Sequence, residues 1–189
     1  MPAQLTNFFS ELALDKLRLS RPSKVIFFCG GALNDKPKDA GTLRHYLLRD
    51  RAIEPRLKGR VILAEAANKL YRDTSYSDLI TFEEDIARVA GLILLVAESA
   101  GSLAELGAFA AVDTIRANLA VLIQNSHYEQ DSFVRFGPIQ KLLAENDERV
   151  GVYPWKVSKS GVVVKSSIRS HVRSITKFIN DLLAKVPAQ

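Results

Sequence analysis

The chain has 189 residues, of which 47% are hydrophobic and 25% are charged, and this composition excludes an intrinsically disordered protein. One cysteine excludes a framework of internal disulfides, and with only three histidines we expect no metal site. No apolar run reaches the roughly 18 residues that a membrane-spanning helix needs, and the first residues do not resemble a secretory signal. We therefore expect a soluble, cytoplasmic protein with no membrane partner.

The net charge of +5 is unevenly distributed, because residues 61–110 hold 3 Lys/Arg against 8 Asp/Glu and both flanking segments are basic. A nucleic-acid-binding protein usually concentrates its positive charge on one element. The last segment offers such a cluster, which consists of Lys156, Lys159, Lys165, Arg169, Arg173 and Lys177. An amphipathic helix with a solvated basic face explains this cluster more simply, so nucleic-acid binding is kept as a rival interpretation.

Hydrophobic patterning predicts strands that alternate with helices along the chain. The expected strands are residues 24–31, 60–65, 92–97, 119–124 and 150–155, and the expected helices are 42–51, 77–89, 102–116 and 168–183. This alternation is typical of an α/β fold with a single Rossmann-like parallel sheet of about five strands and helices on both faces. We expect one domain over residues 1–189, with a core at about 24–155 and a C-terminal helix at 165–185.

Unusual residues follow the predicted strands. Gly30 and Gly31 follow the first strand, Glu65 ends the second, and residues 98–105 and 125–131 follow the third and fourth. Ligands of open α/β sheets bind beyond the carboxyl ends of the strands. The sequence therefore predicts one site at that edge of the sheet.

The segment AESAGSLAELGAF, residues 97–109, is the most informative. Small residues such as Ser99 and Gly101 allow close approach of a ligand, and Ser102 at a helix start would offer free N–H groups to an anion. Glu105 would lie in the first turn of that helix. A carboxylate at this position can attack a sugar C1 or stabilise the cation that forms as a glycosidic bond breaks.

A purely structural interpretation competes with this one. Ser102 and Glu105 have the spacing of a capping box, and so do Thr81 and Glu84. Glu83, Glu84 and Asp85 would by default lie together on a solvated helix face. If the side chain of Asp85 instead points into the crevice, it could exchange a proton with a leaving base, and repulsion from Glu105 would raise one pKa of the pair.

Several of these segments resemble known families. One resemblance is to nucleoside 2-deoxyribosyltransferases. It is carried by the first predicted strand with its glycine turn and by the segment Gly101-Ser-Leu-Ala-Glu-Leu-Gly107, whose glutamate matches the nucleophile of those enzymes. The residues from Asp85 to Val89 approximate a second motif of the same enzymes. A closer resemblance is to the effectors of retrons, which are bacterial anti-phage systems. The segments that carry it are FFCGG, TFEEDIA, ESAGSLAELGAF and DSFVRFGPI. The resemblance covers roughly residues 24–145. Phe27 replaces a tyrosine that is usual in the transferases, and a C-terminal winged-helix domain of larger retron effectors is not expected here.

The resemblance implies an N-glycosidase, acting as a hydrolase or transferase on a nucleoside, nucleotide or NAD, and functioning as a toxin in antiviral defence. It implies Glu105 and Asp85 as catalytic residues and no cofactor. The substrate would lie at Gly30, Gly31, Ser99, Gly101 and Ser102. A retron reverse transcriptase with its RNA–DNA product is the implied partner, and the transferases imply a homo-oligomer.

Two further interpretations compete with the enzyme. A non-catalytic nucleotide-binding sensor of the same fold would use Gly101 and Ser102 and leave Glu105 as a cap. Nucleotide phosphoribohydrolases that resemble lysine decarboxylases carry a P-G-G-x-G-T-x-x-E loop, of which the residues from Ala97 to Glu105 keep only the final half.

Overall fold

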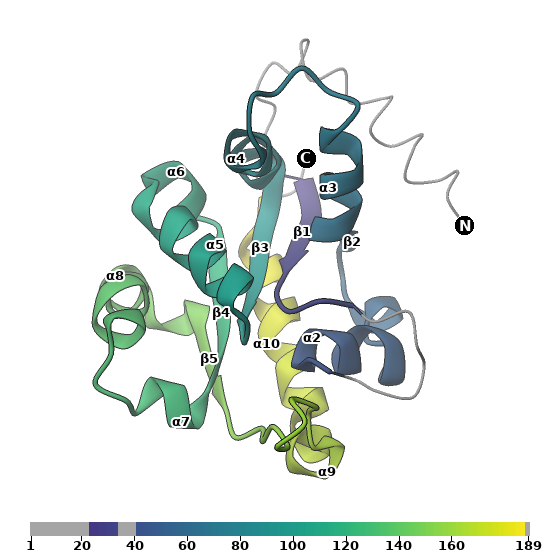
Figure 1. Ribbon diagram of the computed structural model, residues 1–189, viewed down its shortest axis with the longest axis vertical. Coiled ribbons are helices and arrows are strands. Elements are labelled where there is room, and N and C mark those ends of the chain that lie inside the picture. The colour runs from purple at the N-terminus through teal and green to yellow at the C-terminus, as the bar shows by residue number, and fades with distance from the viewer. Residues whose placement is uncertain (1–22, 34–40, 188–189) are drawn as a thin grey trace.

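The computed structural model describes residues 23–33 and 41–187. Its centre is a five-stranded sheet in the order β2-β1-β3-β4-β5, in which all paired strands are parallel (Figure 1). The strands are β1 (Ser23–Cys29), β2 (Arg60–Leu63), β3 (Ala90–Ala97), β4 (Leu119–Gln124) and β5 (Val150–Tyr153). The predicted α/β fold with a parallel sheet is confirmed.

Helices cover both faces of this sheet (Figure 1). One face carries α4 (Leu79–Val89), α5 (Ala100–Ala111), α6 (Asp113–Arg116), the π-helix η4 (Arg135–Ile139) and α8 (Gln140–Glu145). The other face carries α2 (Leu43–His45), the π-helix η2 (Tyr46–Asp50), α9 (Lys165–Ile168) and α10 (Val172–Lys185). The remaining elements are η3 (Glu54–Arg56), α3 (Ala64–Tyr71), α7 (Asn125–Tyr128), η5 (Asp147–Arg149) and η6 (Arg169–His171).

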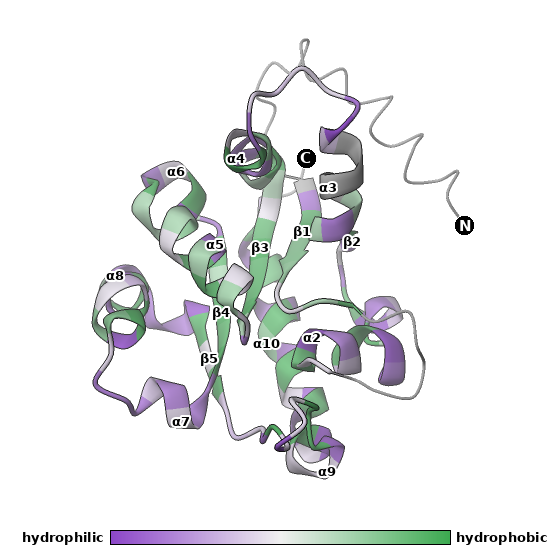
Figure 2. Cartoon of the chain, in the orientation of Figure 1, coloured by the Kyte–Doolittle hydropathy of each residue, from purple (hydrophilic) through white to green (hydrophobic). Residues whose placement is uncertain are grey.

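Two hydrophobic cores result, one on each face of the sheet. Successive side chains of a strand point to opposite faces, so Phe27 packs in the core under α4 and α5, whereas Phe28 packs in the core under α2 and α10. All eight residues of β3 are buried, which is why its sequence is a continuous apolar run. Figure 2 shows the consequence as hydrophobic strands inside amphipathic helices.

Several predicted boundaries differ from the structure. The second strand ends at Leu63, and Glu65 lies in the first turn of α3 instead of ending the strand. The helix predicted over 102–116 begins earlier, at Ala100, and is split into α5 and α6 because Val112 has an extended backbone. The last predicted helix is preceded by α9 and η6, and it extends to Lys185. Among the described residues, no helix is both long and apolar enough to cross a membrane.

Candidate functional site

The carboxyl edge of the sheet begins at the glycine turn after β1. Gly30 has a φ of +150°, which L side chains rarely adopt, and a Cβ atom there would lie 2.9 Å from Cδ of Arg44. At Gly31 a Cβ atom would lie only 2.5 Å from Cγ2 of Thr42. The two glycines are therefore required by the close approach of the segment that opens α2. Their predicted contact with a substrate stays a prediction.

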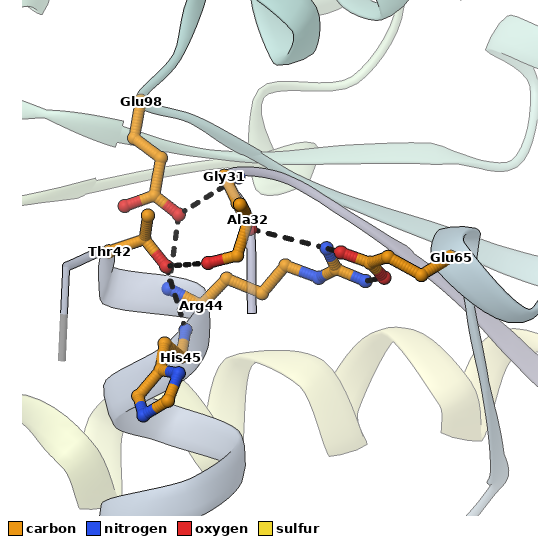
Figure 3. Close-up of polar contacts among 7 residues, drawn as sticks. All are labelled: Gly31, Ala32, Thr42, Arg44, His45, Glu65 and Glu98. Carbon is orange, nitrogen blue, oxygen red and sulfur yellow. Dashed lines mark hydrogen bonds and ion pairs between the residues drawn. The ribbon is translucent and has the colours of Figure 1, made fainter. Parts of the chain in front are cut away.

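Glu98, directly after β3, fixes the start of α2 (Figure 3). Its carboxylate accepts hydrogen bonds from the backbone N–H groups of Gly31 at 3.2 Å, Leu43 at 2.5 Å and Arg44 at 3.1 Å. Burial raises the pKa of Glu98, although the three N–H donors and the charge of Arg44 oppose this rise. A carboxylate at a helix N-terminus satisfies donors that have no partner within the helix. Glu98 therefore positions α2 against the sheet.

Arg44 is a residue of this edge that the sequence did not predict as part of a site. Its side chain is fully buried, and it forms a two-pronged ion pair with Glu65, with Nη1–Oε1 at 2.6 Å and Nη2–Oε2 at 2.5 Å (Figure 3). Nη1 also donates to the backbone oxygen of Gly31 at 3.2 Å. In the sequence Arg44 looks like one of several basic residues on an amphipathic helix, so no local signal distinguishes it.

Glu105 lies in the second turn of α5, and its Oε2 atom is buried without a hydrogen-bond partner among the described residues. Burial raises the pKa of Glu105 to about 7; the charges of Glu83 and Glu65 add to this rise, and Arg44 opposes it. Buried carboxylates usually have hydrogen-bond partners, so an unpartnered oxygen makes Glu105 a candidate for a functional role.

Glu83 is the second buried carboxylate of this region. The expectation that Glu83 lies on a solvated helix face is wrong, because it lies on the face of α4 that packs on the sheet and is only 6% exposed. Burial raises the pKa of Glu83 to about 7, and the charge of Glu65 adds to this rise. The charge of Glu83 contributes to the raised pKa of Glu105, so the two carboxylates lie in the same region of the site.

Asp85 lies on the other side of α4. Residues two apart on a helix differ by about 200° in direction, so the turn that buries Glu83 directs Asp85 away from the sheet. Asp85 accepts a hydrogen bond from the Tyr76 hydroxyl at 2.7 Å and pairs with Arg88 at 3.1 Å, and its side chain is 37% exposed. The structure thus brings Glu83, and not Asp85, towards Glu105. The predicted catalytic role of Asp85 stays untested.

The start of α5 differs from the predicted one, in which Ser102 began the helix and formed a capping box with Glu105. Its N-cap is Ser99, whose Oγ accepts from the Ser102 backbone N–H at 3.2 Å, while the Ser102 Oγ accepts from Ser99 N–H at 2.9 Å and from Glu98 N–H at 3.1 Å. The capping box expected for Ser102 and Glu105 is therefore wrong, and Glu105 has no capping role.

The second expected capping box, which joined Thr81 to Glu84, is also wrong. Asp78 is the N-cap of α4, and its carboxylate accepts from the Thr81 backbone N–H at 2.8 Å. Gly101 has open space where a Cβ atom would lie, as expected for a residue that a ligand could approach, although its predicted contact stays untested.

Cys29, the last residue of β1, lies near the carboxylates of Glu105 and Glu83. Burial, followed by the charge of Glu105, raises the pKa of its thiol well above the ordinary value, so the thiol stays protonated and unreactive. Within residues 23–33 and 41–187, no three His, Cys, Asp or Glu side chains are grouped so that they could hold a metal ion.

The fold and this site define an α/β protein with buried carboxylates at the carboxyl edge of a parallel sheet. The chain belongs to the STM3845 retron effector family, whose model matches residues 40–189. It is also 26% identical, over 190 residues, to a retron Ec73 protein of Escherichia coli that is named as a ribosyltransferase/DNA-binding protein. The match covers 97% of this chain but 58% of that relative, so the chain spans well under two thirds of the relative's length. The resemblance to retron effectors is thereby confirmed.

Proposed function

We propose that the chain is an N-glycosidase that cleaves the base–sugar bond of a nucleoside, nucleotide or NAD, with Glu105 as the nucleophile. The observation that carries this proposal is the buried Oε2 atom of Glu105, which has no hydrogen-bond partner among the described residues and lies at the edge of the sheet where ligands bind. Membership of a retron effector family and the ribosyltransferase name of the E. coli relative support glycosyl transfer as the reaction class.

In the first step, a Glu105 carboxylate oxygen attacks C1 of the sugar and the C1–N bond breaks. The electron pair of that bond stays on the base nitrogen, which takes a proton from the carboxylic acid of Glu83. A pKa of about 7 supports this role, because it keeps a large share of Glu83 protonated near neutral pH.

In the second step, a water molecule attacks C1 and the Glu83 carboxylate takes its proton, so Glu105 is released and both groups return to their starting state. A second base in place of water would make the protein a transferase. Gly101 and the N-terminal turn of α5 would approach the sugar, since a Cβ atom at Gly101 would meet no other described segment within 4 Å.

The experiment is chromatography of the purified protein incubated separately with NAD, nucleotides and deoxynucleosides. We expect free base from the wild type, none from Glu105→Gln, and a fall of about 10² to 10⁴ in rate for Glu83→Gln. Asp85→Asn is the matched control on the same helix, and we expect its rate to stay close to that of the wild type.

Two results would contradict the proposal. Base release by Glu105→Gln at the wild-type rate would show that Glu105 is not the nucleophile, whereas no base release by the wild type from any of these substrates would favour the nucleotide-binding sensor. A large loss in Asp85→Asn with full activity in Glu83→Gln would reverse the roles assigned to these two carboxylates. Nucleoside monophosphates tested beside free nucleosides separate the phosphoribohydrolase alternative.

The family also supports a biological setting for this activity. We propose that the chain acts as a toxin in retron defence and that a retron reverse transcriptase with its RNA–DNA product is its partner; the relative's DNA-binding name is consistent with such a partner. The predicted homo-oligomer can be measured by light scattering of the purified chain.

A further inference from the structure

A second site candidate lies on the opposite face of the sheet from Glu105. It is a groove of about 850 Å³ between the η2–η3 segment and the helical segment formed by α9, η6 and α10. Four arginines line it, namely Arg51, Arg56, Arg169 and Arg173. We call it the arginine groove.

The arginine groove joins distant parts of the sequence. Arg169 and Arg173 are four residues apart, which places them on one face of the C-terminal helical segment. Arg51 and Arg56 come from the N-terminal half and flank Ala52, whose φ of +44° is the one positive value at a non-glycine residue of the described chain. Strained backbone of this kind persists where the surrounding structure holds it, and it is common at functional sites.

Within residues 23–33 and 41–187, the positive charge of the arginine groove is not neutralised by ion pairs. Among the described residues, no carboxylate forms an ion pair with any of the four guanidinium groups, whereas Arg44, Arg88 and Arg116 each have such a partner. The neighbouring Asp50 is already paired with Lys165 at 2.7 Å. The Nε atom of Arg51 is in addition buried without a hydrogen-bond partner.

Such a gathering of unpaired positive charges attracts anions. Hydroxyl groups complete the lining, from Ser166, Ser170 and Thr176. Guanidinium and hydroxyl groups are donors that proteins direct at phosphate oxygens.

The lining also indicates which phosphate compound fits. None of the side chains that line the arginine groove is aromatic, so it offers no stacking surface for a base. A row of arginines and hydroxyls without such a surface suits contacts that follow a chain of phosphates independently of base sequence. We propose that the arginine groove binds the sugar–phosphate backbone of a nucleic acid. This inference rests on the groove alone and does not depend on the N-glycosidase activity.

Fluorescence anisotropy with a labelled DNA duplex of about two helical turns, and with one of its strands alone, tests this proposal. The variant Arg169→Ser with Arg173→Ser is compared with Lys156→Ser with Lys159→Ser, which removes the same charge from exposed positions of the C-terminal segment outside the groove. Affinity is measured over a range of salt concentrations, and thermal melting establishes that both variants are folded.

We expect the arginine variant to bind at least about tenfold more weakly and to lose about two from the slope of log affinity against log salt, while the lysine variant stays near the wild type. Equal losses in both variants would attribute binding to net charge and overturn the assignment of the groove. Unchanged affinity in the arginine variant would do the same. Tight binding of tripolyphosphate with no binding of either DNA would show a small-anion site instead. A second variant, Arg51→Ser with Arg56→Ser, repeats the test from the other wall.

Discussion

Arg44 and Glu65 form a two-pronged ion pair that crosses the carboxyl edge of the sheet, from the first turn of α2 to the first turn of α3. The guanidinium group is fully buried, whereas the Glu65 carboxylate is 41% exposed. Arg44 is also the cation that opposes the rise in the pKa of Glu105. One buried arginine thus links the structure of this edge to the ionisation of the proposed nucleophile.

Replacement of Arg44 should lower the stability of the folded protein. We expect Arg44→Gln to lower the free energy of unfolding by about 2 kcal/mol, less than for a fully buried pair because Glu65 remains partly solvated. Urea unfolding measures this loss. Arg49→Gln, at an exposed position of the same helical segment, is the control and should change stability by no more than about 0.5 kcal/mol. Equal stability of the two variants would contradict a structural role for the pair.

The buried carboxylates predict how stability depends on pH. Because the pKa of Glu105 is raised in the folded protein from 4.5 to about 7, the folded state binds more protons than the unfolded state between these values. The contribution of Glu105 to stability must therefore fall as pH rises through this window, by about 3 kcal/mol at most, and does not change further above it. The variant Glu105→Gln cannot lose this proton, so its melting temperature should fall less over the same window.

The control for this measurement is Glu54→Gln, which changes an exposed carboxylate on η3. Its melting temperature should follow the wild type across the whole pH range. If Glu105→Gln also follows the wild type, then Glu105 does not have a raised pKa and the account of its burial is wrong. Glu83→Gln should behave like Glu105→Gln, because the pKa of Glu83 is raised to about 7 as well.

Two glycines at the same edge should respond in opposite ways to an added methyl group. We expect Gly31→Ala to destabilise the protein by about 1 to 3 kcal/mol, since its Cβ atom would lie 2.5 Å from Cγ2 of Thr42. Gly101→Ala adds its methyl group in open space in the first turn of α5, where alanine favours the helix by roughly 0.5 kcal/mol or more. Chemical unfolding of both variants measures the difference.

Gly101→Ala also tests the predicted contact with substrate. A folded and stable variant that binds substrate as well as the wild type would show that Gly101 does not lie against the sugar. Weaker binding with unchanged stability would support the contact, because the added methyl group meets no atom of another described segment within 4 Å.

The sequence by itself determined the sheet. Buried parallel strands are continuous apolar runs, so each of the five strands could be located, and β4 was predicted with its observed bounds. Glu105 could be selected as a candidate because its motif is local and resembles that of a known family. Helix starts were less predictable: several serines, threonines and aspartates can each act as an N-cap, and only the backbone decides that Ser99 and Asp78 do so.

The tertiary structure decided which charged groups meet. The rotation of α4 about its own axis selects Glu83 over Asp85 as the carboxylate near Glu105, and a difference of two residues in the helical repeat cannot be resolved before the buried face is known. Arg44 reaches Glu65 across 21 positions of sequence, and the arginine groove joins residues more than 100 positions apart. These contacts depend on how the helices pack on the sheet, because the local sequence around a charged residue does not specify which distant residue will lie beside it.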